Sequence, residues 1–332
     1  MTPRRASGAP IRHNSPVQSD RGFQRGAVSG IVAGAVYGGV TRLSVAMPSL
    51  GAVFGVMTLG FLFLVPMAIG YLTVRAVENP SRLFRLLGPW ASCVLVVLTA
   101  WLVGAEGAIC IVMALPVMLA FSTIGGLIAA SRIGRAPAAL PMLALLPYVV
   151  MPLEHGRSSP VKIVSTVTSI DIDAPPATVW PLVISVDSIT PSERRTALFS
   201  VIGFPEPIAA TLDHPGLGGV RTATFEHGIV FRESIVDWQP ERRLRFTIAP
   251  DSIPATTLDP HVTIGGPYFD VLTGTYDLAP VGNRTRLTLT SEHRVSTRFN
   301  VYAGWWANRI MRSIQSNILN VLRDRAERGR AS

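Results

Sequence analysis

Residues 165–183 read STVTSIDIDAPPATVWPLV, and within this stretch the periodicity of the apolar residues changes. Ile170 and Ile172 alternate with Asp171 and Asp173, which is the pattern of a β-strand with one dry face and one solvated face. The chain just upstream is almost unbroken apolar sequence, as in AALPMLALLPYVVMPLEHG. The stretch therefore predicts that a water-soluble domain begins here.

A helix is predicted directly after this strand. The residues Ala-Pro-Pro interrupt the strand pattern, and apolar residues then recur at helical spacing from Val179 to Val183. Asp173 is a candidate acidic cap, and the two prolines lack N–H groups that a first helical turn leaves unpaired in any case. We therefore expect a strand at 163–172 and a helix at 175–184.

The sequence before this domain predicts a membrane region. Hydrophobic residues make up 48% of the 332-residue chain, and their long runs lie before residue 153. A helix needs about 20 apolar residues to cross the roughly 30 Å hydrocarbon core of a bilayer. A fifth run, 138–153, is shorter and contains three prolines, so we expect it to be kinked or partly re-entrant. We favour the interpretation in which this run spans. We predict a disordered basic tail at 1–25 and a transmembrane helix bundle at 26–153 with four to five spans. The four longer runs are 27–47, 52–74, 86–104 and 108–130.

The distribution of charge predicts the orientation of this region. The net charge is +9, and residues 1–156 hold 11 arginines against 4 acidic residues. These arginines lie mainly in the tail and in the loops 75–85 and 131–137, which the positive-inside rule places in the cytoplasm together with the N-terminus. The chain is then a multi-pass protein of the inner (cell) membrane. Its C-terminal domain is extracytoplasmic if five segments span and cytoplasmic if four do.

Four glycines in the first span recur at intervals of four residues. Gly26, Gly30, Gly34 and Gly38 form one row on a helix, which lets another helix approach closely. We prefer packing within the bundle over a dimer seam as the explanation. Arg42 is the only charge well within a span, and it lies near enough to the outer end to snorkel to the surface.

The part of the chain after residue 160 has the pattern of an α+β domain. Short turn signals such as HPGLGG, QPERR and PVGNRT separate its strands, and a long amphipathic helix is predicted at 299–327. Seven strands joined mainly by short turns predict one antiparallel sheet, against which the apolar stripe of the helix packs. After the strand at 163–172, the strands are expected at 208–213, 219–227, 229–238, 243–249, 270–279 and 284–294.

This order of elements resembles the helix-grip, or START-like, superfamily (SRPBCC), which includes polyketide cyclases and lipid-transfer domains. The resemblance covers about 160–328, and the chain looks like bacterial membrane proteins that carry this domain after several spans. It implies a sheet wrapped on the long C-terminal helix, with a cavity for an apolar molecule between them. The residues that carry it are SIDIDAPPATVW, VDWQPERRLRFTI, GTYDLAPVGNRTRLTLTSEH and the long C-terminal helix.

Strand periodicity selects the side chains expected in that cavity. Glu233 alternates with apolar residues, so its carboxyl is expected inside, with a raised pKa or with Arg221 or Arg232 as a partner. His293 shares a face with two leucines and is expected inside as well. A Glu or His near a strand end is also often solvated or structurally hydrogen-bonded. The cavity candidates are Glu233, Phe231, Phe246, Tyr276, His293, Trp306 and Ile310.

The segment 250–268 is a long loop rich in proline and glycine, a type that is often a lid or a binding loop. His261 is the candidate residue on such a gate, although a plain surface loop explains the segment equally well. The scattered histidines and the two cysteines, both in apolar runs, predict no metal site and no cofactor. The nearly balanced charge of residues 157–332, 19 basic against 17 acidic, argues against nucleic acid as a partner.

Three functions are compatible with this sequence. The preferred hypothesis is membrane-anchored binding of a hydrophobic small molecule, such as a lipid, a polyketide or an isoprenoid-like compound, which needs only an apolar cavity with a few polar groups. The second is a cyclase or dehydratase that uses a cavity acid-base residue. The third is a regulatory membrane protein whose soluble domain binds a protein. The expected partners are the bilayer and a hydrophobic ligand, and an enzymatic role is the less favoured reading.

Overall fold

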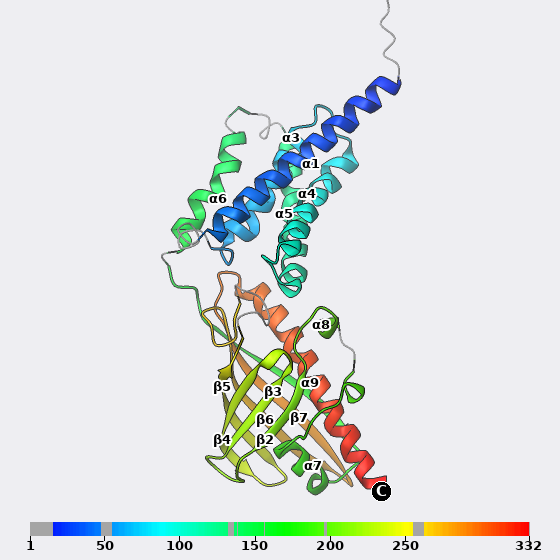
Figure 1. Cartoon of the computed structure of the whole chain (residues 1–332), viewed down its shortest axis with the longest axis vertical. Coiled ribbons are helices and arrows are strands. Elements are labelled where there is room, and N and C mark those ends of the chain that lie inside the picture. The colour runs from blue at the N-terminus through cyan, green and yellow to red at the C-terminus, as the bar shows by residue number, and fades with distance from the viewer. Residues whose placement is uncertain are drawn as a thin grey trace, which may run out of the picture. The chain divides into compact units, whose positions relative to one another are not determined.

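The chain divides into two compact units, one of membrane-type helices and one of mixed α and β structure (Figure 1). The computed structural model describes residues 16–47, 55–131, 136–137, 139–155, 157–195, 198–254 and 262–331.

The described residues of the N-terminal half form helices, three of which are long and apolar enough to cross a membrane. These three are Phe23–Ala46, Arg82–Leu102 and Ala108–Ala130. Two further apolar helices, Gly60–Arg75 and Ala139–Glu154, are shorter. The elements are α1 (Pro16–Ala46), the π-helical turn η1 (Gly60–Leu64), α3 (Val65–Arg75), α4 (Arg82–Leu102), α5 (Ala108–Ala130) and α6 (Ala139–His155).

The helices differ from the predicted spans in three places. The run at 52–74 is helical only from Gly60 in the described residues, because Gly55 and Gly60 weaken the helix there. The run at 138–153 forms the helix α6, which extends to His155. α1 begins at Pro16, inside the range predicted as a tail, while residues 1–15 lie outside the described residues.

The glycine row of α1 lies against α3 within the same chain. A Cβ atom at Gly30 would come within 2.2 Å of the backbone oxygen of Thr73, and one at Gly34 within 2.3 Å of the Thr73 hydroxyl. One at Gly38 would come within 2.7 Å of Ile69, so the two helices run antiparallel at close range. The small residues therefore permit an intramolecular contact that larger side chains would block.

The C-terminal unit carries seven strands and a long final helix, as predicted. Two prolines start α7, and strong turn signals separate the later strands. The elements are β1 (Lys162–Ile172), α7 (Pro176–Ile184), η3 (Pro191–Glu193), α8 (Leu198–Val201), β2 (Pro207–Leu212), β3 (Val220–Phe225), η4 (Glu226–Gly228), β4 (Val230–Gln239), β5 (Arg243–Ser252), β6 (Phe269–Val281), β7 (Arg284–Val295) and α9 (Asn300–Ala331).

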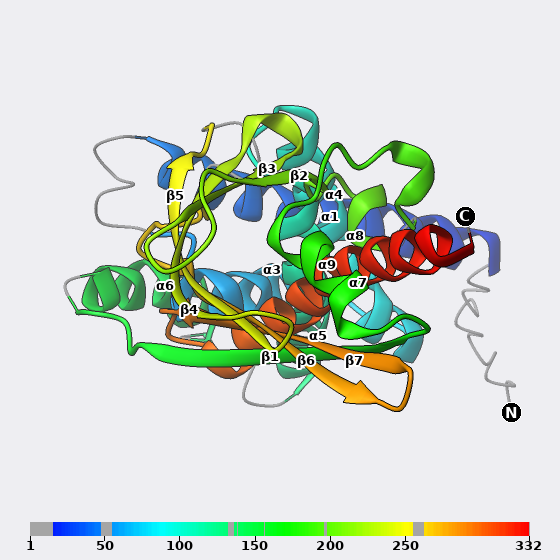
Figure 2. The same ribbon diagram turned by 90° about the horizontal axis from the view of Figure 1, so that it is seen from below.

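The seven strands form one antiparallel sheet in the order β1-β7-β6-β5-β4-β3-β2. Figure 2 shows that this sheet curls, and that α9 and α7 lie on its open side. The main core lies between them and includes Leu244 and Leu287 of the sheet and Leu319 and Leu322 of α9, all at most 1% exposed. The prediction of a helix-grip fold, with a curved sheet wrapped on the last helix, is confirmed.

The start of α7 differs from the sequence interpretation, in which Asp173 is the cap. The N-cap residue is Pro175, and no side-chain cap hydrogen bond is formed there. The backbone N–H of Asp173 donates to Glu327 of α9 at 3.0 Å, and its carboxylate lies 3.6 Å from Arg284. Asp173 lies two residues before the N-cap, which is too early for its side chain to cap the helix. Its contacts instead connect the end of β1 to α9 and to β7.

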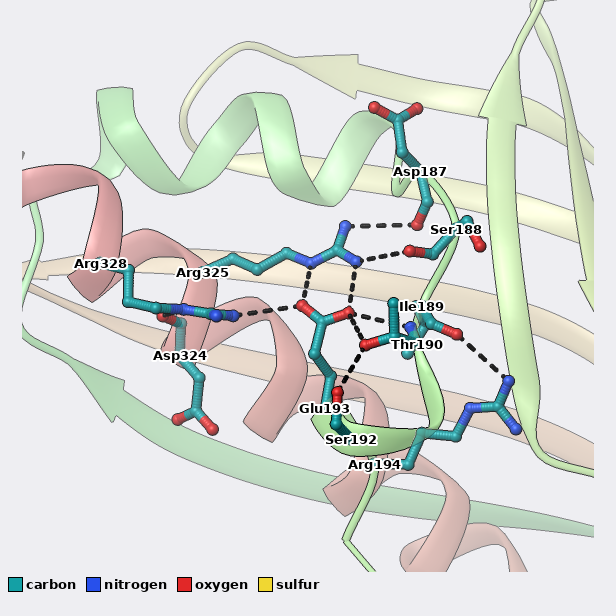
Figure 3. A network of polar contacts seen from close by, with 10 residues as sticks. All are labelled: Asp187, Ser188, Ile189, Thr190, Ser192, Glu193, Arg194, Asp324, Arg325 and Arg328. Atoms are coloured by element: carbon teal, nitrogen blue, oxygen red, sulfur yellow. Dashed lines mark hydrogen bonds and ion pairs between the residues drawn. The ribbon is translucent and has the colours of Figure 1, made fainter.

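A polar cluster joins the C-terminal part of α9 to the segment after α7 (Figure 3). Glu193 accepts hydrogen bonds from Arg325 Nε and Nη2, both at 2.9 Å, and from Thr190 N at 2.9 Å. Arg328 adds a contact at 3.1 Å, and Arg325 also donates to the carbonyl of Ser188 at 2.9 Å. The hydrogen bonds from Arg325 and from Thr190 hold the pKa of Glu193 well below its usual range.

We expect the Glu193 cluster to make stability depend on acid. Because its pKa is lowered in the folded chain, its contribution is present above the ordinary glutamate pKa near 4.5 and is lost as pH falls below that value. Glu193→Gln should lower the melting temperature at pH 7 by about 5 °C, equivalent to about 2 kcal/mol, and by less at pH 4 and below. Thermal unfolding of both proteins across pH measures this. Asp251→Asn, in an exposed pair with Arg232, is the control, and an equal loss at all pH values would contradict the prediction.

Candidate functional site

The C-terminal domain encloses an apolar cavity between the curled sheet and α9. Its volume is about 120 Å³. Strands β2 to β7 supply most of the wall, and one face of α9 closes it. The larger apolar side chains of the wall are Phe225, Phe231, Phe246, Phe269, Met311, Ile314 and Ile318.

A buried ion pair forms the most polar part of this wall. Arg221 of β3 and Glu233 of β4 face each other in the strand register, and Arg221 Nη1 donates to Glu233 Oε2. Arg221 is 4% exposed and Glu233 7%. Arg221 Nε also donates to the carbonyl of Ile184 at 3.1 Å, which fixes the guanidinium at the end of α7. The pairing of β3 with β4 and the contact with the end of α7 therefore hold the ion pair in place.

Two aromatic rings lie next to the guanidinium. The Arg221 Cζ atom is 5.5 Å from the ring centre of Phe246 and 5.9 Å from that of Tyr276. A cation at this distance is attracted by the ring electrons, and more strongly where water is excluded. The rings therefore replace part of the hydration that Arg221 loses on burial.

The charge states of this group follow from burial and from the ion pair. Burial opposes the charge of Arg221, but Glu233 and Tyr276 outweigh it and raise the Arg221 pKa. Burial raises the pKa of Glu233 above its ordinary value, although Arg221 counteracts part of the shift. Burial also raises the pKa of Tyr276, so its hydroxyl stays protonated and can act as a donor.

Gln315 of α9 is a second polar group on the wall. Its Nε2 donates to the Ser291 hydroxyl at 2.9 Å and to the Thr166 carbonyl at 3.1 Å, and its Oε1 accepts from Thr168 at 2.7 Å. These contacts bind α9 to β1 and β7. Gln315 is not among the cavity residues predicted from the sequence, although its position one residue after Ile314, inside an apolar stripe, marks it as a buried polar residue.

Four of the predicted cavity residues line the cavity, namely Phe231, Glu233, Phe246 and Tyr276. His293, Trp306 and Ile310 do not, although all three are buried. Of the two arginines weighed as partners for Glu233, Arg221 forms the pair, whereas Arg232 points outward, 3.7 Å from Asp251. His261 lies outside the described residues.

The geometry of α9 explains why Trp306 and Ile310 miss the cavity. A stripe drawn at every fourth residue advances by about 400° per step, so it winds about 40° further around the helix each time. Ile314 and Ile318 line the cavity, but Ile310 and Trp306, further back on the same stripe, have turned away. The face that lines the cavity is Met311, Ile314, Gln315 and Ile318.

His293 is placed inside the domain, as its strand face predicts, but beyond the cavity wall. It is fully buried, its ring lies 5.7 Å from that of Phe269, and its two ring nitrogens have no partner among the described residues. Burial lowers its pKa to about 4, so the imidazole is neutral at pH 7.

A register shift in β6 changes which side chain of this strand faces the cavity. Val271 lines the cavity, where simple alternation from Tyr276 predicts Leu272.

Comparison with known proteins agrees with this architecture. The sequence profile of the family described as polyketide cyclase / dehydrase and lipid transport matches residues 164–327. No curated protein matches the chain significantly.

Several solved structures are similar to about half of this chain. A Rhizobium loti protein is 16% identical, with a TM-score of 0.31, over 49% of this chain and 99% of its own. The Zhui aromatase/cyclase from a Streptomyces species is 16% identical, with a TM-score of 0.32, over 50% of this chain and 95% of its own. A Thermus thermophilus protein is 18% identical, with a TM-score of 0.32, over 49% of this chain and 97% of its own.

The profile match spans β1 to α9, and the described strands and final helix have the predicted helix-grip order. The C-terminal domain of this chain therefore matches the family described as polyketide cyclase/dehydrase and lipid transport.

Proposed function

We propose that the C-terminal domain binds a hydrophobic small molecule in its cavity, and that the N-terminal helices hold this domain at a membrane. The observation that carries the proposal is an apolar hollow whose wall has one buried ion pair, Arg221–Glu233. Binding sites of this kind combine apolar walls with a few fixed polar groups that orient the ligand. A domain that served only as a protein-binding surface would not need such a hollow.

The size of the cavity limits what fits without movement. An apolar cavity of about 150 Å³ in another protein binds benzene, so about 120 Å³ accommodates a group the size of one ring. A lipid, a polyketide or an isoprenoid-like compound would have to displace part of the wall. Ile264 and Phe269 border the cavity beside the loop that was predicted to be a lid or binding loop. We expect the wall to open at Ile264 and Phe269.

The polar wall suggests how a ligand would be oriented. The protonated hydroxyl of Tyr276 and the guanidinium of Arg221 are donors, so a ligand oxygen beside them would gain hydrogen bonds. The rest of the ligand would lie against the phenylalanine and isoleucine side chains. An apolar compound with one carbonyl or hydroxyl oxygen fits this arrangement better than a pure hydrocarbon.

Filling the cavity should abolish binding. Ala223 of β3 is 5% exposed and lines the cavity, whereas its neighbour Thr222 is exposed on the other face of the strand. We expect native mass spectrometry of the chain, released from detergent micelles, to show a bound hydrophobic molecule. Ala223→Leu should reduce the bound fraction at least tenfold, while Thr222→Leu leaves it unchanged.

The absence of any bound molecule in the unmodified chain, together with no thermal stabilisation by added lipids, polyketides or isoprenoids, would refute the binding function. If Ala223→Leu and Thr222→Leu reduced the bound fraction equally, the molecule would not be bound in the cavity.

An enzymatic role is the second candidate, because Glu233 combines a raised pKa with a position on the cavity wall. A carboxyl of this kind can exchange a proton with an enolisable substrate at neutral pH. Glu233→Gln should then retain the ligand but convert none of it, as measured by mass spectrometry of the ligand after incubation. Conversion at the unmodified rate would exclude Glu233 as the acid-base group.

The side of the membrane on which the domain lies depends on α6. With 17 residues this helix is about 25 Å long, slightly shorter than the hydrocarbon core of about 30 Å. The cytoplasmic N-terminus, and an extracytoplasmic domain if α6 spans, therefore remain predictions from the arginine distribution.

A further inference from the structure

A second hollow lies on the other side of α9 from the cavity, and the two share no lining residues. It is an open groove of about 680 Å³. Its wall combines the aromatic side chains Phe199, Trp305 and Trp306 with Arg309 and Arg312, and Asn308 and two serines complete it. One part of the groove is thus aromatic and the other part cationic, whereas the wall of the cavity is mainly apolar.

Two aromatic side chains of the groove are in unusual environments. Trp305 is 52% exposed, although an indole ring is largely apolar. Trp306 is 9% exposed, and its Nε1 is buried without a hydrogen-bond partner among the described residues. Indole N–H groups are donors and usually find an acceptor when buried. The exposed ring of Trp305 indicates that the groove is completed by another molecule that supplies apolar contact, whereas the buried N–H of Trp306 lies out of reach of a ligand in the open groove.

The cations of the groove are available to a ligand. Arg309 lies over the Trp305 ring, with Cζ 4.9 Å from its centre, and Arg312 is exposed one turn further on. Neither has an acidic partner in the part of the chain that the structure describes. A guanidinium binds phosphate oxygens through two parallel N–H groups, so the pair favours a phosphate-bearing ligand.

The start of α9 is fastened to the linker that leads from the membrane helices. Asn300 Nδ2 donates to the carbonyl of Pro160 at 2.6 Å, and Arg298 Nη2 donates to that of Arg157 at 2.7 Å. Only six residues separate the end of α6 at His155 from the start of β1 at Lys162, and fully extended they span at most about 20 Å. Trp305 follows Asn300 by about 8 Å along the helix. The groove therefore lies at the tethered end of the domain.

We infer that this groove binds the headgroup of an anionic phospholipid at the surface of the membrane that holds the N-terminal helices. Arg309 and Arg312 contact the phosphate, and the Trp305 ring enters the interface, a region where tryptophan is enriched in membrane proteins. This contact is independent of whether the cavity is occupied. Each basic residue near an anionic surface strengthens binding about fivefold, so two strengthen it about 25-fold.

The test uses the full chain in nanodiscs of phosphatidylcholine, with or without added phosphatidylglycerol, and with a nitroxide quencher on the lipid headgroups. An environment-sensitive fluorescent amino acid is placed at position 301, where Val301 is 83% exposed one turn before Trp305. The same probe at position 281 is the control. Lys162 pairs with Val295 and Ile172 with Thr285, so the turn next to Val281 lies at the far end of β1, about 30 Å from the tether.

We expect the probe at 301 to be quenched strongly in nanodiscs with phosphatidylglycerol and weakly in those without it, and the probe at 281 to be quenched in neither. Arg309→Gln with Arg312→Gln should reduce the quenched population about 25-fold relative to the unquenched one, whereas Arg309→Lys with Arg312→Lys should retain it. Equal quenching at 301 in both kinds of nanodisc, or no effect of the glutamine variants, would overturn the inference. So would a response of the probe to free glycerol phosphate without lipid quenching, which would mean that the groove takes a soluble anion.

Discussion

Arg221→Met is expected to lower the melting temperature of the C-terminal domain by about 10 °C. The substitution leaves Glu233 buried beside the cavity without its cationic partner, and breaking a buried pair in this way costs about 3–5 kcal/mol. For a domain of this size each kcal/mol corresponds to about 2–4 °C. Tryptophan fluorescence during heating measures the effect, because Trp180 and Trp238 pack edge to face within the domain, with ring centres 5.2 Å apart.

The double variant Arg221→Met with Glu233→Leu is the matched control. It removes both charges together, and replacing a buried ion pair by apolar side chains is often neutral or stabilising. We therefore expect it to recover most of the lost stability. A double variant as unstable as Arg221→Met alone would show that the loss comes from the shape of the arginine side chain, and an unaffected Arg221→Met would show that Glu233 is not held charged by its partner.

Leu322→Ala is expected to lower stability by about 2–5 kcal/mol, since it leaves a hole where α9 packs on the sheet. Leu322 is 1% exposed and belongs to the main core of the domain. Leu217, in the turn between β2 and β3, is 68% exposed, so Leu217→Ala should change the melting temperature by less than about 2 °C. Thermal unfolding of the three proteins gives the comparison. If Leu322→Ala and Leu217→Ala lowered the melting temperature by similar amounts, the packing of α9 on the sheet would not account for the stability of the domain.

The fold could be predicted from local patterns because each strand carries its own signals. The alternation of Ile170 and Ile172 with aspartates and the short turns between later strands predict β1 to β7 to within a few residues. Where a bulge inserts one residue into β6, the alternation fails, and Val271 takes the inward position in place of Leu272. The cap at Asp173 was wrong because its true contacts, Glu327 and Arg284, are distant in sequence.

The candidate site could be predicted only in part. Glu233 and Tyr276 follow from strand parity, but the choice of Arg221 over Arg232 depends on the register between β3 and β4, which parity alone leaves open. The helical residues of the wall depend on how α9 is rotated, and the apolar stripe that includes Trp306 winds away from the cavity. Long apolar runs predicted membrane helices, and within the described residues Phe23–Ala46, α4 and α5 are long and apolar enough to cross a membrane.

The hydrogen bonds from Asn300 and Arg298 to the linker also decide how the domain would respond to mechanical force. β1 is an edge strand, and its first rung, Lys162 opposite Val295, lies directly after the linker. A force applied to this first pair alone would separate β1 from β7 by breaking their backbone hydrogen bonds one after another. Because Pro160 and Arg157 are hydrogen-bonded to the segment between β7 and α9, a force on the linker acts first on this segment. Part of the force is then carried by α9, the longest helix of the domain. Tension on the linker would then load α9 before it separates the edge strand β1 from β7.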